Sequence, residues 1–328
     1  MSGPYEILYN RSLDVSATIH IPVKLFVILV MVRHTPADMR SMSMFLLNGM
    51  LWNLGANLIF TFVHLYPMYP STCYRADGIL SHFGYSELFG HIMFCLEYFC
   101  VLNCAVALVF VFPYRYLIFS HSETVSNVRT HWVVLFCASI HIGSVALFTL
   151  LYFRWTVNYA EYPIQDELPD NDLLFCFKPY GLEKNMLVLF FLAFTVVVAF
   201  VALTSTLLLF RDIHRKVGLM NKSILDKHRR VLIALVIVTS VPVLFGAFPL
   251  MIAVVTAFFP HLPYAEPICL VCIVTLINHG AVYAIALVVA IKPYRTACRA
   301  IFANLMPRKV TCVVNLLSTT VVHKYNES

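Results

Sequence analysis

The stretch MLVLFFLAFTVVVAFVALTSTLLLF, from Met186 to Phe210, runs for 25 residues without a charged side chain. A helix that crosses the hydrocarbon core of a bilayer needs about 20 consecutive, mostly apolar residues. Only helices and closed barrels cross a membrane, because lipid offers the backbone no hydrogen-bond partners. The segment therefore predicts a membrane-spanning helix, and the rest of the chain must be organised around it.

Six further apolar stretches of comparable length flank this one, and the shortest of them contains Lys24. The composition agrees, because 60% of the 328 residues are apolar and only 12% are charged, against about 45–50% and about 25% in soluble proteins. This excludes a soluble enzyme, a disordered chain and a single-pass anchor. We expect an all-α fold, a bundle of seven transmembrane helices, over approximately the ranges 16–32, 42–65, 89–111, 132–153, 186–210, 231–259 and 268–291.

The charges divide unequally between the two faces that seven spans would create. The first, third and fifth connections and the carboxy-terminal tail hold 17 of the 23 Lys and Arg residues, and the opposite face holds 5. The acidic residues divide in reverse, with 11 of 17 on the opposite face. Basic residues mark the cytoplasmic side of membrane proteins. We therefore expect an extracellular amino terminus over residues 1–15, the bundle over 16–291, and a cytoplasmic tail over 292–328 with an interfacial helix at 296–305.

The predicted outer face carries two further signals. Asn10 begins the triplet Asn10-Arg11-Ser12, which is a glycosylation acceptor. Of the ten cysteines, only Cys73 and Cys176 lie in outer loops, where disulfides persist. We expect these two cysteines to form a disulfide that pins the second outer loop to the first; two free thiols are the alternative.

Two charged residues lie inside predicted spans. Glu97 lies about eight residues into the third span and Lys24 lies inside the first. An ionisable group at such depth is costly, so it faces the bundle interior and is a candidate for function. Glu97 could contact a ligand or ion, or could be a neutral acid bonded to a neighbouring helix. An ion pair with Lys24 would satisfy both groups.

Other polar residues in the spans could share a ligand site with Glu97. We expect His91, Asn103 and His279 to contact a ligand together with Glu97, although asparagine and histidine in such helices often only hydrogen-bond neighbouring helices. Asn53 and Asn57 share one helix face at this spacing and fit that structural role. Pro242 and Pro249 remove backbone hydrogen bonds from the sixth span and predict a bend there.

The sequence contains none of the common catalytic or phosphate-binding motifs. We therefore expect no enzymatic activity, no cofactor, no metal site and no nucleic-acid partner. A lone acid in a multi-span bundle leaves two functions open. One is a receptor for a small molecule, and the alternative is a small-solute transporter or ion channel that uses Glu97 as a relay.

Several short motifs resemble nematode serpentine chemoreceptors of the Str superfamily, especially the Srh and Sri groups, which are receptors of the G-protein-coupled type. The motifs run in order along nearly the whole chain. They are Thr35-Pro36, Phe45-Leu46-Leu47-Asn48 with Trp52, Pro67 and Pro70 with Cys73, Arg75 and Gly78, His279-Gly280, and Lys292-Pro293-Tyr294-Arg295.

The resemblance implies a chemosensory receptor of the plasma membrane, in sensory cilia. An apolar pocket with few polar groups suits a small volatile or lipid-like molecule as its ligand. It implies that Tyr114 and Arg115, at the inner end of the third span, and Arg229 and Arg230, in the basic third inner loop, contact a heterotrimeric G protein. Pro113-Tyr114 precedes the arginine where rhodopsin-like receptors have an acid, so their ionic lock does not carry over.

Overall fold

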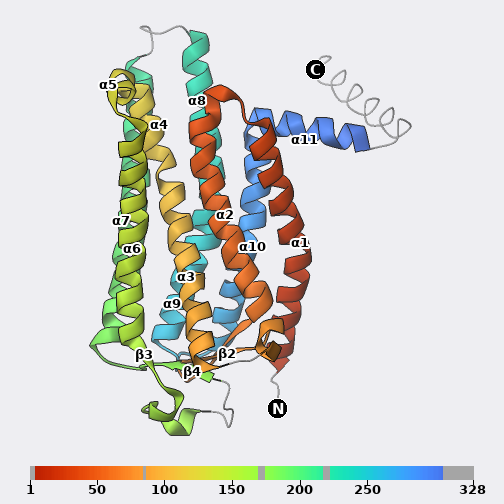
Figure 1. Cartoon of the computed structure of the whole chain (residues 1–328), viewed down its shortest axis with the longest axis vertical. Helices are drawn as coiled ribbons and strands as arrows, with labels where there is room; N and C mark the ends of the chain where they lie inside the picture. Colours follow the sequence, from red (N-terminus) through yellow and green to blue (C-terminus); the bar gives the residue numbers. More distant parts are fainter. Residues whose placement is uncertain (1–3, 84–85, 169–173, 217–221, 306–328) are drawn as a thin grey trace.

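The computed structural model describes residues 4–83, 86–168, 174–216 and 222–305. Helices dominate this part of the chain, and short strands join them at one end (Figure 1). The α-helices are α1 (Pro4–His34), α2 (Arg40–Val63), α3 (Glu87–Val109), α4 (Val111–Ser120), α5 (Ser122–Asn127), α6 (Thr130–Trp155), α7 (Leu182–Arg215), α8 (Lys222–Pro242), α9 (Phe248–Phe258), α10 (Ala265–Ala290) and α11 (Lys292–Leu305).

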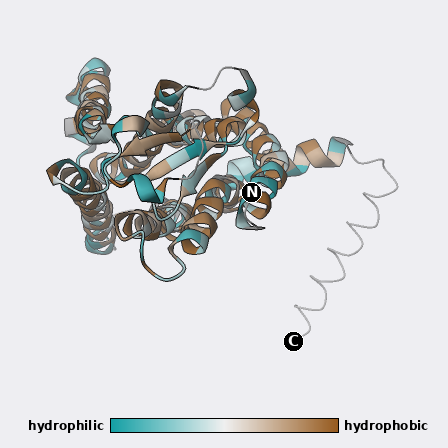
Figure 2. Cartoon of the chain, turned by 90° about the horizontal axis from the view of Figure 1, so that it is seen from below, coloured by the Kyte–Doolittle hydropathy of each residue, from teal (hydrophilic) through white to brown (hydrophobic). Residues whose placement is uncertain are grey.

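Seven helical segments of the described chain are long and apolar enough to cross a membrane, as the sequence predicts. Two of them are compound. The third joins α3 to α4 over Glu87–Ser120, and the sixth joins α8 to α9 over Arg229–Phe258. The residues of these helices are mostly hydrophobic (Figure 2), and many of their large apolar side chains are exposed, which suits contact with lipid.

The first helix begins at Pro4, well before the apolar stretch that starts near residue 16. Packing explains the early start, because Tyr9 and Leu13 are each only 2% exposed and Tyr9 Oη donates to Leu65 O at 2.9 Å. Most of segment 1–15, expected as a separate extracellular terminus, is therefore part of α1. The contact is between segments distant in sequence, so hydropathy alone does not reveal it.

A four-stranded antiparallel sheet, absent from the all-α prediction, closes the end of the bundle at which α1 begins (Figure 1). We call this the sheet end. The strand order is β1-β2-β4-β3, and Cys73 pairs with Cys176 in register and is joined to it by a disulfide. The strands are β1 (Leu65–Met68), β2 (Cys73–Ala76), β3 (Thr156–Val157) and β4 (Leu174–Phe177).

Hydrogen bonds and ion pairs fix this sheet to the helices beneath it. Tyr66 of β1 donates through its hydroxyl to Glu266 Oε1, at the start of α10, at 2.5 Å. Burial and this neighbouring carboxylate raise the pKa of Tyr66, so the hydroxyl remains a donor. Arg75 of β2 pairs with Glu6 of α1 at 2.7 Å and with Asp77. These contacts fix the sheet to the first and last spans, and the disulfide joins its strands β2 and β4.

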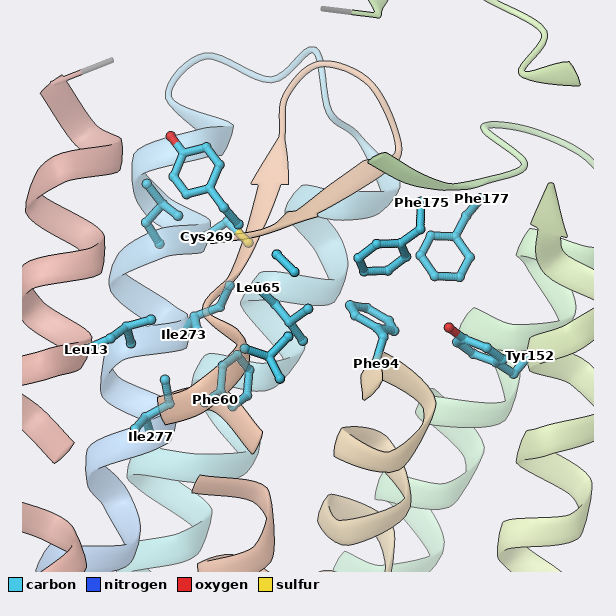
Figure 3. Close-up of a cluster of buried hydrophobic side chains, with 14 of the residues drawn as sticks. Leu13, Phe60, Leu65, Phe94, Tyr152, Phe175, Phe177, Cys269, Ile273 and Ile277 are labelled. Atoms are coloured by element: carbon cyan, nitrogen blue, oxygen red, sulfur yellow. The ribbon is translucent and has the colours of Figure 1, made fainter. Parts of the chain in front are cut away.

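An aromatic cluster lies between the sheet and the helices. Phe175 and Phe177 of β4 are 0% exposed and lie against Phe94 of α3 and Tyr152 of α6 (Figure 3). The Trp155 ring stacks on the ring of Phe177 at 4.0 Å. Phe175 and Phe177 are two residues apart and therefore lie on the same face of β4, which packs on α3 and α6.

The sixth span is irregular where its two prolines predict a bend. Helix α8 ends at Pro242, and a π-helical turn over Val243–Ala247 links it to α9, whose second residue is Pro249. A π turn arises where the regular backbone hydrogen-bond ladder is interrupted, and proline lacks the N–H that the ladder needs. We call Val243–Ala247 the π turn.

The tail helix predicted over 296–305 is present as α11 and begins earlier, at Lys292. It runs across the end of the bundle opposite the sheet (Figure 1). Tyr294 is fully buried and its hydroxyl lies 2.8 Å from Ser43 Oγ and 2.9 Å from Thr35 Oγ1. These contacts fix α11 to the first connection. The rest of the predicted tail lies outside the described residues.

Candidate ligand-binding site

Two adjoining cavities lie inside the helix bundle. The larger encloses about 170 Å³ between α2, α3, α7, the π turn and α10, and the smaller encloses about 90 Å³ nearer the sheet. Their walls are mostly aliphatic and aromatic side chains, as is usual for sites that bind small organic molecules. Both cavities are lined by Phe60, Glu97, Val101, Phe191, Leu250 and Leu276.

Glu97 of α3 therefore lies where the two cavities meet. Its side chain is deeply buried, with a residue exposure of 4%, and its Oε2 has no hydrogen-bond partner among the described residues. Lys24, the other charged residue predicted inside a span, is 0% exposed and donates from Nζ to the backbone oxygen of Asn53 at 3.5 Å. The structure therefore brings both predicted intramembrane charges into one region without a direct ion pair between them.

A polar network surrounds Lys24 and joins three spans. The His279 Nδ1–H of α10 donates to the Leu276 carbonyl, so its Nε2 accepts from Asn53 Nδ2 of α2 at 3.0 Å. Asn57 Nδ2 donates to Ile277 O at 2.8 Å. Asn53 and Asn57 thus act between helices, as their spacing predicts.

Two glycines allow this network to form. A Cβ at Gly280 would lie 2.5 Å from Lys24 Nζ and closer still to Asn53 Oδ1. A Cβ at Gly246, in the π turn, would lie 3.4 Å from His279 Cδ2. Because Gly246 has no side chain, the His279 ring packs directly against the sixth span. The network therefore connects α1, α2 and α10 to the irregular part of the sixth helix.

The four residues expected to contact a ligand divide into two pairs. Glu97 and His279 line the larger cavity, whereas His91 and Asn103 line neither cavity. His91 lies beneath β4 and its backbone oxygen accepts from Tyr152 Oη at 2.8 Å. Asn103 faces α6, with its Oδ1 2.5 Å from His141 Nδ1. The structure gives both of these residues a packing role, and we do not place them in the site.

The sequence did not point to the opposite wall of the larger cavity. That wall comes from α7 and the sixth span, and it contains only small or apolar side chains and two threonines. Such residues carry no chemical signal that distinguishes them from ordinary lipid-facing positions. The residues concerned are Thr195, Val198, Ala202, Thr239, Pro242, Val243 and Ala247.

The predicted glycosylation acceptor lies within α1 rather than on a loop. Asn10 Nδ2 donates to Asp77 Oδ2 at 3.3 Å, and Asn10 Oδ1 is buried. The amide nitrogen is the atom that would carry a glycan, and here it contacts the chain segment after β2. Asn10 as a whole is partly exposed, and its glycosylation stays a prediction.

The residues expected to meet a G protein lie at the end of the bundle opposite the sheet. Arg115 of α4 is partly exposed and lines a small pocket with Phe119 and with residues of α7 and α8. Tyr114 packs its ring against Phe45 with a centroid distance of 5.2 Å. Arg229 and Arg230 are exposed on α8. Residues 217–221 of the third inner connection lie outside the described residues.

Seven helices long and apolar enough to cross a membrane, packed around a mostly apolar cavity, define a polytopic helix-bundle membrane protein. The family described as serpentine type 7TM GPCR chemoreceptor Srh matches residues 6–304. The chain therefore belongs to the Srh family of serpentine chemoreceptors, as the sequence motifs indicate, and this is a receptor family rather than a class of enzymes. No curated protein matches the chain.

Proposed function

We propose that this chain binds an external small molecule in the two joined cavities and signals through a heterotrimeric G protein. The observation that supports this most directly is Glu97, whose buried Oε2 has no hydrogen-bond partner in the described part of the chain and lies where the two cavities meet. An unpaired buried polar atom costs about 1–3 kcal/mol. A ligand that supplies the missing hydrogen bond would recover that free energy, and the cavity is therefore suited to a partner with one polar group.

We further propose that the sheet end faces the exterior, with the amino terminus outside and α11 in the cytoplasm. The unequal division of basic residues supports this orientation. The disulfide between Cys73 and Cys176 at the sheet end supports it independently, because the cytoplasm is reducing. By family membership, the plasma membrane of a sensory cilium is the proposed location.

Ligand binding would act by favouring one packing of the bundle over another, since only differential affinity can shift a conformational equilibrium. The connection from the cavity to the sixth span through His279 and Gly246 supplies a route for that shift. Movement of the sixth span would change the surface around Arg115, which lines the small inner pocket together with residues of α8. That surface, together with Arg229 and Arg230, is the proposed G-protein contact.

A small-solute transporter or channel with Glu97 as a relay is the alternative function. Relays of this type pass a proton or ion along several ionisable groups. Glu97 is the only acid among the described residues that line either large cavity. A current or uptake that persists in vesicles without any G protein would favour the alternative over a receptor.

Glu97→Gln tests the ligand site. After a ligand has been found by screening cells that express the chain with a G-protein readout, this variant is expected to weaken the response about twofold to tenfold. The reason is that glutamine cannot reproduce the hydrogen bond of the carboxyl group in full, and a hydrogen bond between neutral groups contributes about 0.5–1.5 kcal/mol. The measurement is the half-maximal concentration of the ligand in the same cells. The exposed acid Glu161 provides the matched control, Glu161→Gln; an unchanged response in Glu97→Gln would remove Glu97 from the site.

Arg115→Ala tests the coupling surface separately from the ligand site. We expect ligand binding to be retained within about threefold while G-protein activation falls at least tenfold, because Arg115 lines neither large cavity and its replacement removes a cation from the proposed contact. Nucleotide exchange on the G protein measures the second quantity. Arg129→Ala, at an exposed position before α6, is the control. Full activation by Arg115→Ala would rule out this residue as a coupling contact.

A further inference from the structure

The cavities are covered on the side that would face the aqueous exterior. Phe175 and Phe177 are 0% exposed and pack between the sheet and the helices (Figure 3). Below them, the wall of the smaller cavity is formed by Leu65, Tyr74, Phe94, Tyr152 and Trp155. Because the sheet is held by its disulfide and by Tyr66 and Arg75, a ligand that arrived from water would have to displace a tightly packed aromatic cluster.

The larger cavity approaches the lipid-facing surface instead. Val243 lines this cavity and is also 58% exposed, so it forms part of a rim between the cavity and the exterior. Across from the sixth span, Thr195, Val198 and Ala202 of α7 line the same cavity and are partly exposed. All four side chains lie near the middle of their spans, Leu182–Arg215 and Arg229–Phe258. The rim therefore lies at the depth of the hydrocarbon core.

The cavity has chemically different ends. Its rim consists of small and apolar side chains together with the Thr195 hydroxyl, which is 3.8 Å from Met251 Sδ. The far wall carries Glu97, Asn53 and His279. Glu97 Oε2 and Asn53 Oδ1 are both buried, and neither atom has a hydrogen-bond partner among the residues that the structure describes. An occupant that fits both ends has an apolar body toward the rim and one uncharged hydrogen-bonding group toward Glu97.

We propose that the ligand reaches this cavity sideways from the bilayer, between α7 and the sixth span, and that it is a membrane-partitioning amphiphile with a single neutral polar end. A hydroxyl or similar group can cross the hydrocarbon to the rim, whereas a charged or zwitterionic headgroup cannot do so at comparable cost. Phospholipids are therefore excluded as ligands. The proposal rests on the proposed ligand-binding role of the cavity, and it adds the chemical class of the ligand and its route.

Photolabelling of the full chain in phosphatidylcholine vesicles tests the route. The probe is 1-hexadecanol that carries a mid-chain diazirine, and peptide mass spectrometry locates its adducts. We expect adducts on Val101 and Ala105, which line the cavity from α3, as well as on outward positions such as Val197 and Phe200 of α7. Adducts confined to outward positions would overturn the proposal, because lipid around the bundle reaches those positions without entering it.

Two rim variants sharpen this test. Ala202→Trp and Val243→Trp narrow the rim from its two sides and are each expected to reduce adducts on Val101 and Ala105 at least fivefold, with outward adducts unchanged. Ala199→Trp, at an exposed position of α7 that does not line the cavity, is the matched control. Val243 is exposed, so its replacement remains informative if Ala202→Trp does not fold. Unchanged α3 labelling in both rim variants would contradict access between these helices.

The same assay tests the polar end. A hexadecane probe with the same diazirine and no hydroxyl is expected to label Val101 and Ala105 at least fivefold less than the hexadecanol probe does. In Glu97→Leu, the two probes are expected to label these residues equally. Equal labelling by the two probes in the native chain would overturn recognition of the polar group. The assay contains no G protein, so a chain that is labelled as expected but never signals would contradict the proposed function and leave this proposal intact.

Discussion

Replacement of Cys73 by serine is expected to lower the free energy of unfolding by about 2–5 kcal/mol, the range typical for loss of a native disulfide. The bond joins residues 103 positions apart, so it closes a long loop that contains the third and fourth spans. In a membrane protein the spans remain inserted when tertiary packing is lost, which restricts the unfolded chain and places the effect toward the lower end of that range. The measurement is the midpoint of thermal inactivation in detergent.

The disulfide also positions the strand that covers the cavities. Cys176 lies between Phe175 and Phe177 in β4, and Cys73 pairs with it in register. Cys176→Ser should therefore lower the free energy of unfolding by the same amount as Cys73→Ser. The double variant should lower it no further than either single variant, because all three remove the same bond. The free and partly exposed Cys137 of α6 gives the control Cys137→Ser. Additive losses in the double variant would show that the thiols act separately.

The spans and the sheet differ in how strongly the sequence encodes them. Each span is a run of about 20 or more apolar residues, a signal that depends on composition alone, and for this reason all seven could be predicted. The strands contain four residues or fewer. Strand β4 pairs with β2, from the distant connection between α2 and α3, and with β3, from its own connection between α6 and α7. Such strands exist only because tertiary contacts assemble them, so neither their bounds nor the burial of Phe175 was predictable.

The candidate site shows the same division. The position of Glu97 inside the bundle could be predicted from the sequence, because an acid inside an apolar helix must face the interior. His91 and Asn103 are likewise polar residues inside an apolar span. They nevertheless contact Tyr152 and His141 on α6 and do not line a cavity. The sequence identifies which side chains are buried and polar, whereas the rotation of a helix about its axis decides whether they meet a cavity or a neighbour. That rotation depends on packing against every adjacent helix.

The second large loss of stability is expected from Gly280→Ala. In most helix interiors this change is favourable by about 0.5–1 kcal/mol, because alanine restricts the unfolded backbone. Here the added methyl group would overlap Asn53 Oδ1 and lie 2.5 Å from Lys24 Nζ, and Lys24 is fully buried with little room to move. Overpacking of this type typically costs about 1–3 kcal/mol. We therefore expect a net loss of stability, measured by the same thermal inactivation assay.

Gly143→Ala in α6 is the matched control, because a Cβ there has no atom within 4 Å. It carries the same change in helix propensity without the clash and should leave stability unchanged or raise it. The variant Asn53→Ala/Gly280→Ala separates the clash from other effects. If the methyl group acts through Asn53, Gly280→Ala should cost at least about 0.5 kcal/mol less once Asn53 is shortened, a departure from additivity typical of residues in contact.

Gly280→Ala is also expected to change the response to ligand, because displacement of Asn53 removes the donor that orients His279. His279 packs against Gly246 and lines the larger cavity, so a rotated ring would alter both the far wall of the cavity and its contact with the π turn. A purely structural effect would lower the amount of folded receptor and leave the half-maximal ligand concentration unchanged. A shift in that concentration for the folded fraction, absent in Gly143→Ala, would instead place the Lys24–Asn53–His279 network between ligand binding and movement of the sixth span.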